Sequence, residues 1–430
     1  MELFPGCYRK VLNDGTGPQV IGQEEPGSKS ISLGLWFRSG SRDEKLTESG
    51  VTHLIEHLLF RGTENRSAYQ ITSDVDRLGG HINGSTSREF LLLSLRLLPE
   101  SLSEGIDILT DLAFNPLFQE DDFRLEKDVV LEEIRSARDN YQSETIRLLQ
   151  EAIWGEESGL SAPIRGTEET VTELSRSSAL DRFNPLKSLD KIMITAAGKL
   201  SFDNLVNCVE DSFPEMSSET RSNQNRATGD QCSTPSKTTE GKTDWRDLNQ
   251  LNCSIGVEGL PKKDDDRFPL EMLNVILGQG MSSRLFRKVR KERGLAYQVT
   301  SSTEYYSDTG LFFVYGSIGP GNLDRFVELV LEEFDDLTNE PVTDEELELA
   351  KKKTKGNLVL GLENNRALMG RLGITALYDT GFLSVEDVIR KLEEVTPEDI
   401  TRVANRLLTR KNLRYSLLGP KVDGATNLFP

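Results

Sequence analysis

Three side chains in one short stretch could together carry out metal-assisted hydrolysis. The stretch reads Gly50-Val-Thr-His-Leu-Ile-Glu-His-Leu-Leu-Phe60, and it contains His53, Glu56 and His57. Two histidines four residues apart lie one turn apart on one face of a helix, so both imidazoles can reach a single metal ion. Glu56 directly precedes the second histidine, where it could stay off the metal and hold a water molecule as general base. The order H-x-x-E-H, the reverse of H-E-x-x-H, therefore predicts a catalytic zinc site.

Histidine is rare in this chain, which makes its placement informative. There are three histidines among 430 residues, and two of them fall inside the motif, the third being His81. The alternative interpretation is a pair of histidines that cap or line an apolar helix. Packing alone seldom produces zinc-type spacing together with a glutamate, so we favour the metal site.

A catalytic zinc usually takes three protein ligands and a water molecule, so the motif requires one more ligand. A long helical stretch is predicted from about residue 120 to 154, and it contains Glu126, Glu132 and Glu133. Glu126 and Glu133 are seven residues apart and lie within about 20° of each other on a helix, whereas Glu132 points about 100° away from Glu133. We expect Glu133 to be the third ligand and Glu126 to be an outer carboxylate. The alternative is a solvated acidic face, as charge runs usually are, but the need for a third ligand decides against it.

The composition bounds the size, the partners and the compartment. A chain of 430 residues is too long for one ordinary core, so we expect two large domains. Its formal net charge is −19, which makes nucleic acid a poor partner and favours basic peptides. The sequence shows no apolar run long enough to span a membrane, no signal-peptide pattern and no C-x-x-C pair. We therefore expect a cytoplasmic protein without a membrane partner, its thiols reduced at Cys7, Cys208, Cys232 and Cys253.

The hydrophobic pattern outlines the elements that must position the motif. Residues 28–37 alternate apolar with small or polar side chains, which predicts a half-buried strand ahead of the motif helix. Residues 81–89 form a polar strand that contains glycine, and residues 90–98 form a strongly apolar one. A polar strand of this kind is typical of a sheet edge that could accept an extended peptide.

The chain divides at a polar segment. Residues 217–242 contain scarcely an apolar side chain and have the composition of a flexible linker. They separate a first domain, residues 1–216, from a second domain, residues 243–430.

The second domain repeats the first in outline. Residues 118–126 resemble residues 342–350, and both segments lead into a long helix. This register places Asn357 where the first domain has Glu133, and the second domain contains no histidine. We expect the first domain to hold metal and the second to be metal-free.

Together these features resemble the pitrilysin/insulinase family of zinc peptidases with the inverted motif, in its short processing-peptidase-like branch. The resemblance runs along nearly the whole chain, and its most specific part is the zinc motif with its distant glutamate. The other matching segments are Gly40–Glu44, Phe60–Thr63, Gly79–Asn83 and Gly278–Tyr297. The resemblance implies one zinc ion per chain with His53, His57 and Glu133 as ligands, Glu56 as base, and Glu126 as a carboxylate that steers a histidine.

The resemblance also implies substrate contacts away from the metal. Asn83 matches an edge-strand asparagine that holds the substrate backbone. Arg290 and Tyr297 are seven residues apart across a glycine, and the residues alone favour surface and core packing. The resemblance instead implies that both contact substrate from the second domain. One departure is Gly84, which stands where the family usually has alanine and could make the edge strand more pliable.

The fold and the reaction follow from the same resemblance. The fold would be α+β, with two homologous domains that each consist of a mainly antiparallel sheet with helices packed on one side and that form a clam-like chamber. The activity would be that of a zinc-dependent endopeptidase cleaving unfolded peptides or amino-terminal extensions, with Glu56 as general base on a metal-activated water. The alternative is a non-catalytic partner or scaffold subunit of a heterodimeric processing peptidase. The chain would form a homodimer, or a heterodimer with a related chain.

Overall fold

The structure is a computed structural model that describes residues 1–213 and 239–422. These residues form two compact units. Unit 1 comprises residues 1–137, 162–213 and 361–382, and unit 2 comprises residues 138–161, 239–360 and 383–422. Among the described helices, none combines the length and the apolar character needed to cross a lipid bilayer.

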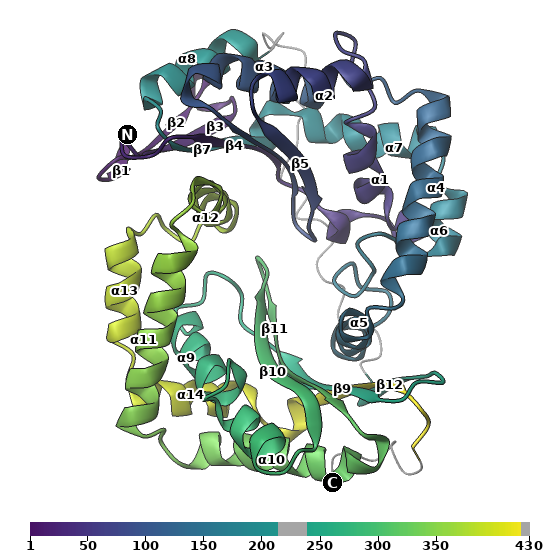
Figure 1. The fold of residues 1–430 in the computed structure, drawn as a ribbon, viewed down its shortest axis with the longest axis vertical. Helices are drawn as coiled ribbons and strands as arrows, with labels where there is room; N and C mark the ends of the chain where they lie inside the picture. Colours follow the sequence, from purple (N-terminus) through teal and green to yellow (C-terminus); the bar gives the residue numbers. More distant parts are fainter. Residues whose placement is uncertain (214–238, 423–430) are drawn as a thin grey trace. The chain divides into compact units, whose positions relative to one another are not determined.

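Unit 1 is built on a seven-stranded sheet with the order β1-β2-β3-β7-β4-β6-β5 (Figure 1). All neighbours in this sheet are antiparallel except β3 and β7, which run parallel. The strands are β1 (Glu2–Phe4), β2 (Cys7–Val11), β3 (Gln19–Glu24), β4 (Ile31–Phe37), β5 (His81–Thr86), β6 (Leu91–Leu97) and β7 (Ile192–Gly198). The helices are α1 (Val51–Leu58), α2 (Ala68–Arg77), α3 (Leu102–Phe114), α4 (Glu120–Ala137), α6 (Glu168–Glu173), α7 (Arg176–Phe183), α8 (Phe202–Ser212) and α12 (Asn365–Tyr378).

Unit 2 is built on a five-stranded sheet with the order β10-β11-β9-β12-β8. Its neighbours are antiparallel except β12 and β8. The strands are β8 (Gly241–Trp245), β9 (Leu251–Glu258), β10 (Ala296–Tyr305), β11 (Gly310–Ile318) and β12 (Arg414–Gly419). The helices are α5 (Tyr141–Trp154), α9 (Arg267–Gly278), α10 (Leu323–Asn339), α11 (Asp344–Gly361), α13 (Val385–Glu393) and α14 (Pro397–Leu407).

The two sheets share one topology, which confirms the expected pair of related α+β domains. Strands β3-β7-β4-β6-β5 of unit 1 follow the same order as β8-β12-β9-β11-β10 of unit 2, and in both runs only the first pair is parallel. The polar strand β5 is the edge of its sheet, as its sequence predicted. Strands β1 and β2 extend the sheet of unit 1 at the opposite edge.

Each unit contains a helix from the opposite half of the sequence. Helix α12 packs on β3, β4 and β7 of unit 1, where Figure 1 draws it in green beside the purple strands. Helix α5 packs on β8, β9 and β12 of unit 2. Helices therefore cover both faces of the unit 1 sheet, and the expectation of helices on one side only is incomplete.

Helix α12 fully buries β4, the strand that was predicted to be half buried. All seven residues of β4 are buried. Leu33 and Leu35 join the large core beneath α3, while Trp36 points the other way and packs with Met369 and Leu372 of α12. The side chains of β4 do alternate between two faces, but a helix far along the chain covers the face that the sequence left unassigned.

The prediction of a single long helix from about residue 120 to 154 is wrong, because the structure has two helices in this stretch. Helix α4 ends at Ala137 and α5 begins at Tyr141. The side chain of Asn140 accepts a hydrogen bond from the backbone N–H of Ser143 at 3.1 Å and so caps the new helix. The predicted linker lies outside the described residues except for residues 239–242, where β8 begins.

Candidate metal centre

The motif helix α1 starts at a tightly packed glycine. Gly50 has φ +96°, and a Cβ there would lie 2.5 Å from the carbonyl oxygen of Arg165, so only glycine fits. The buried carboxylate of Glu44 accepts hydrogen bonds from the backbone N–H groups of Gly50 at 2.8 Å and Thr52 at 2.7 Å. These bonds satisfy backbone donors that a helix start leaves free. Glu44 lies in a matching segment, but no sequence pattern indicated this capping role.

Helix α4 packs on α1 and turns two carboxylates toward it. Glu126 lies near His57, and Glu133 lies near both histidines. Glu132 is 72% exposed and pairs with Arg135 on the same helix. The structure thus separates Glu132 from Glu133 in the way that the helix phase predicted.

Three side chains present a compact set of metal-binding atoms. His53 Nε2 lies 3.1 Å from Oε2 of Glu133, and His57 Nε2 lies 3.6 Å from its Oε1. One ligand atom from each residue lies within 4.8 Å of the other two. In a tetrahedral zinc site with bonds of about 2.0–2.1 Å, ligand atoms are about 3.3 Å apart. The donor types and their spacing therefore fit zinc.

Glu126 and Arg61 orient the second histidine. His57 Nδ1 lies 2.8 Å from Oε2 of Glu126, which directs Nε2 toward Glu133. Arg61 pairs with the other oxygen of Glu126, whose side chain is only 4% exposed. Burial alone would raise the pKa of Glu126, but the hydrogen bonds from His57 and Arg61 outweigh it and hold that pKa below its usual range. A carboxylate bound to the far nitrogen of a histidine is the usual support of a metal-binding imidazole.

The charges around the two imidazoles favour a cation. Burial opposes ionisation of His57, yet the hydrogen bond that His57 donates to Glu126 and the charges of Glu133, Glu126 and Glu56 raise its pKa. Burial likewise opposes ionisation of Glu133, but His53 and His57 lower its pKa. Three carboxylates that remain ionised beside two imidazoles provide the negative field that a divalent cation would neutralise.

Glu56 stands beside this donor set rather than in it. Its Oε2 lies 3.6 Å from His53 Nδ1 and accepts a hydrogen bond from the hydroxyl of Thr86 on β5 at 2.5 Å. Burial would raise the pKa of Glu56, but the nearby His53 and the hydrogen bond from Thr86 keep it below its usual range. The carboxylate is therefore an acceptor at neutral pH, as a general base must be.

Arg165 completes the surroundings of Glu133. Its Nε lies 3.2 Å from Oε2 of Glu133, and its side chain is half exposed. Arg165 lies in a loop more than thirty residues after Glu133 in the sequence. No spacing pattern predicts this contact. Arg165 is a residue of the site that sequence reasoning missed.

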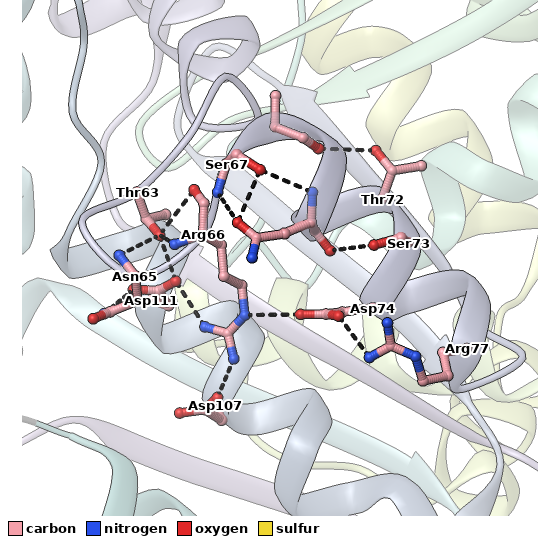
Figure 2. Close-up of polar contacts among 12 residues, drawn as sticks. Thr63, Asn65, Arg66, Ser67, Thr72, Ser73, Asp74, Arg77, Asp107 and Asp111 are labelled. Carbon is pink, nitrogen blue, oxygen red and sulfur yellow. Dashed lines mark hydrogen bonds and ion pairs between the residues drawn. The ribbon is translucent and has the colours of Figure 1, made fainter.

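A polar cluster fixes the turn that follows α1, and Figure 2 shows its members. The buried Asp111 of α3 accepts hydrogen bonds from Thr63 Oγ1 at 2.6 Å, Asn65 Nδ2 at 2.7 Å and Arg66 at 2.7 Å. Arg66 also pairs with Asp74 at 3.3 Å and with Asp107. Because Arg61 lies at the start of this turn, the cluster holds the segment that carries Arg61 to Glu126. Thr63 lies in a matching segment, but nothing in the sequence linked it to Asp111.

The remaining predicted site residues are not part of the metal-binding donor set. Asn83 is exposed on β5, next to Gly84 but on the opposite face of the strand from Gly84 and Thr86. Arg290 and Tyr297 lie in unit 2, where the guanidinium carbon of Arg290 is 5.7 Å from the centre of the Tyr297 ring. Tyr297 is 74% exposed, so this pair is a surface feature rather than core packing.

Two family models match consecutive parts of the chain. Residues 19–168 match the model described as insulinase, peptidase family M16, and residues 173–354 match the model described as the peptidase M16 inactive domain. The first match contains all members of the donor set, and the second lies mostly in unit 2.

Bacterial relatives match almost the whole chain. An uncharacterized zinc protease of Streptomyces coelicolor is 32% identical over 97% of this chain and 91% of that protein. The uncharacterized zinc protease YmxG of Bacillus subtilis is 32% identical over 94% of this chain and 96% of that protein.

Solved structures share the fold. A protease from Helicobacter pylori superposes with a TM-score of 0.85 at 19% identity, covering 96% of this chain and 99% of that one. A Pseudomonas fluorescens structure, described as a peptidase M16 inactive domain, has a TM-score of 0.83 at 20% identity and covers 97% of this chain and 98% of that one. With its donor set of two histidines and one glutamate, the chain therefore belongs to the M16 insulinase family of zinc proteases, in its short two-domain bacterial form.

Proposed function

We propose that this protein is a zinc-dependent endopeptidase that cleaves unfolded peptides or amino-terminal extensions. The observation that carries the proposal is the convergence of His53, His57 and Glu133, with Glu56 beside them and outside the donor set. A zinc ion held by these three residues would supply Lewis acidity toward a peptide carbonyl and lower the pKa of a bound water molecule. One such ion per chain is expected, because unit 2 has no histidine.

The residues of the chain have distinct roles in this reaction. Glu56 takes a proton from the attacking water and returns it to the leaving amine, for which its lowered pKa keeps it ionised. Glu126 holds His57 through Nδ1, and Arg61 holds Glu126 in turn. The imidazole of His57 is thereby fixed with Nε2 toward the reaction site.

The substrate class follows from the edge strand and the charge. β5 ends its sheet next to α1, and an extended peptide could add to that edge through backbone hydrogen bonds, with Asn83 as a side-chain contact. The net charge of −19 favours peptides with basic residues. Arg290 and Tyr297 are proposed as substrate contacts from unit 2, and the exposure of Tyr297 supports this.

The compartment and assembly are proposals as well. Cys7 and Cys253 are buried free thiols, which suits a reducing cytoplasm. The family resemblance favours a homodimer or a heterodimer with a related chain, which light scattering of the purified protein would distinguish from a monomer.

Replacement of Glu56 by Gln tests the function directly. The amide keeps the shape of the side chain but cannot accept the proton, so hydrolysis of a quenched basic peptide should fall by at least about 100-fold. Zinc content, measured by atomic absorption, should stay at that of the unaltered protein. A chelator should abolish the activity of the unaltered protein, and added zinc should restore it.

The same experiments test the alternative that the chain is a non-catalytic subunit. Near-normal turnover of Glu56→Gln would contradict the proposed role of Glu56. Absence of any zinc-dependent hydrolysis from the unaltered chain, alone and with a related chain, would favour the non-catalytic subunit.

A further inference from the structure

The edge strand β5 contacts Glu56 through alternate residues. Ile82, Gly84 and Thr86 are partly covered, while Asn83 and Ser85 between them are exposed. Successive side chains of a strand point to opposite faces, so Gly84 and Thr86 share the face that packs on α1.

Gly84 and Thr86 contact different parts of the Glu56 side chain. The hydroxyl of Thr86 donates to Oε2 at 2.5 Å. A Cβ on Gly84 would lie 2.8 Å from Oε1 and 2.6 Å from Cγ, closer than such atoms approach, so the absence of a side chain makes room for Glu56. Within residues 1–213 and 239–422, no hydrogen bond reaches Oε1. One carboxylate oxygen is thus held, and the other remains available as an acceptor.

A similar contact in unit 2 joins two uncharged side chains. A turn glycine follows the helix in each half, Gly62 after α1 and Gly280 after α9. The residue six positions before this glycine is Glu56 in the first half and Asn274 in the second. Asn274 of α9 is bonded to the hydroxyl of Ser301 on β10, with Oγ to Oδ1 at 2.6 Å, and both residues are buried. A hydroxyl on the strand therefore bonds the helix side chain in both units, and in unit 1 that helix side chain is a carboxylate.

We propose that Thr86 positions the carboxylate of Glu56. Its hydrogen bond fixes Oε2, while Oε1 remains available to accept a proton. This inference rests on the proposed function, because it concerns the geometry of the general base. Thr86 is a positioning residue, since it acts through Glu56. The reason is physical: a glutamate has several rotatable bonds, and a base must be held within hydrogen-bond reach of the proton that it takes.

Thr86→Val and Thr86→Ser test the hydrogen bond with nearly unchanged shape. Thr86→Val should lower kcat about tenfold, the effect of losing one hydrogen bond to a charged group, with KM and zinc content unchanged. Thr86→Ser keeps the hydroxyl and should retain activity within about threefold. In a crystal structure of Thr86→Val, the Glu56 carboxylate should leave its present position. The matched control is Thr110→Val in α3, because the buried Thr110 hydroxyl has no hydrogen-bond partner among the described residues and its loss should leave kcat unaltered.

The outcomes separate this inference from the proposed function. If Glu56→Gln is inactive but Thr86→Val retains full kcat, the positioning role is wrong and the function stands. If Thr86→Val loses zinc or unfolds more easily than Thr110→Val, Thr86 is structural and the inference fails. If Glu56→Gln remains active, both proposals fail.

Discussion

Helices α4 and α11 occupy the same place in the order of elements, after β6 and α3 in unit 1 and after β11 and α10 in unit 2, yet of the two only α4 contributes to the donor set. Each has 18 residues, and position 14 is Glu133 in α4 and Asn357 in α11. Position 7 is Glu126 in α4 and the buried Ala350 in α11. The repeated fold is thus independent of the carboxylates.

The partner helices α1 and α9 differ in the same way. Counted from the turn glycines Gly62 and Gly280, the places of His53 and His57 are taken in unit 2 by Glu271 and Val275. Helix α9 still packs on β10, as α1 packs on β5. Apolar packing and sheet register suffice for the fold, and a metal centre requires a few additional side chains on one copy.

The largest effect should come from removing a ligand at the position where the units differ. Glu133→Gln should weaken zinc binding by more than about 100-fold, since even changes outside the ligand set cost 10–100-fold. Asn357→Ala, at the matching position of unit 2, and Glu132→Gln, on the exposed side of α4, should leave zinc affinity within about twofold. Competition with a chromogenic chelator measures all three. Equal losses in Glu132→Gln and Glu133→Gln would show that the assigned helix face is wrong.

Loss of the supporting carboxylate should have the next largest effect. Glu126→Gln removes the charge that orients His57 and leaves Arg61 without its buried partner, so zinc affinity should fall by about 10–100-fold. The same chelator competition applies, with Glu132→Gln as the control. Unaltered affinity and activity would mean that Glu126 is only a packing residue.

The exchanged helix can be tested with two glycines of α12. A Cβ on Gly373 would lie 2.1 Å from the Trp36 ring, whereas a Cβ on Gly370 would meet nothing within 4 Å. Gly373→Ala should destabilise unit 1 by about 3 kcal/mol through overpacking. Gly370→Ala should be neutral or should stabilise the protein by up to about 1 kcal/mol, because alanine favours helix. Urea unfolding followed by tryptophan fluorescence measures both.

The same contact predicts that the sequence halves are poor fragments. A fragment ending near residue 216 would lack α12 and expose Trp36 and Met193, which are buried now. Such a fragment should aggregate even if it contains every zinc ligand. A monomeric, cooperatively folding fragment would contradict the role given to α12.

The smallest effect should come from the polar cluster after α1, and it depends on pH. Burial would raise the pKa of Asp111, but hydrogen bonds from Thr63, Asn115, Asn65 and Arg66 hold it below its usual range. Ionised Asp111 therefore stabilises the folded state above its unfolded pKa of about 3.9, and this stability is lost as the pH falls through the lower folded value.

Asp111→Asn should accordingly cost about 2 kcal/mol of unfolding free energy at pH 7 and progressively less below about pH 4. Urea titrations at several pH values measure the difference. Asp107→Asn is the control, since Asp107 pairs with the same arginine from an exposed position and should cost less than about 1 kcal/mol. A difference that stays constant from pH 7 to pH 3.5 would mean that ionisation of Asp111 does not matter.

Much of the site was predictable because helix geometry is local. The spacing of His53 and His57 determined that both face one way, and the phase of α4 separated Glu133 from Glu132. The polar composition of β5 indicated an edge strand for a similar reason, since a central strand would bury both faces. Helices α4 and α11 begin at Glu120 and Asp344, which the predicted register pairs, and the same register pairs Glu133 with Asn357.

The tertiary structure decided which distant groups complete these local patterns. Periodicity predicts the face that a residue occupies but not the partner that covers it, so the capping by Glu44, the contact of Arg165 and the exchange of α5 and α12 could not be derived from spacing. The sequence alone determined a zinc motif on a helix, a carboxylate on a second helix and a repeat without ligands. The packing of chain segments far apart in sequence determined how Arg61, Thr86 and Gly84 surround that motif, because those contacts form only when the strands and helices are assembled.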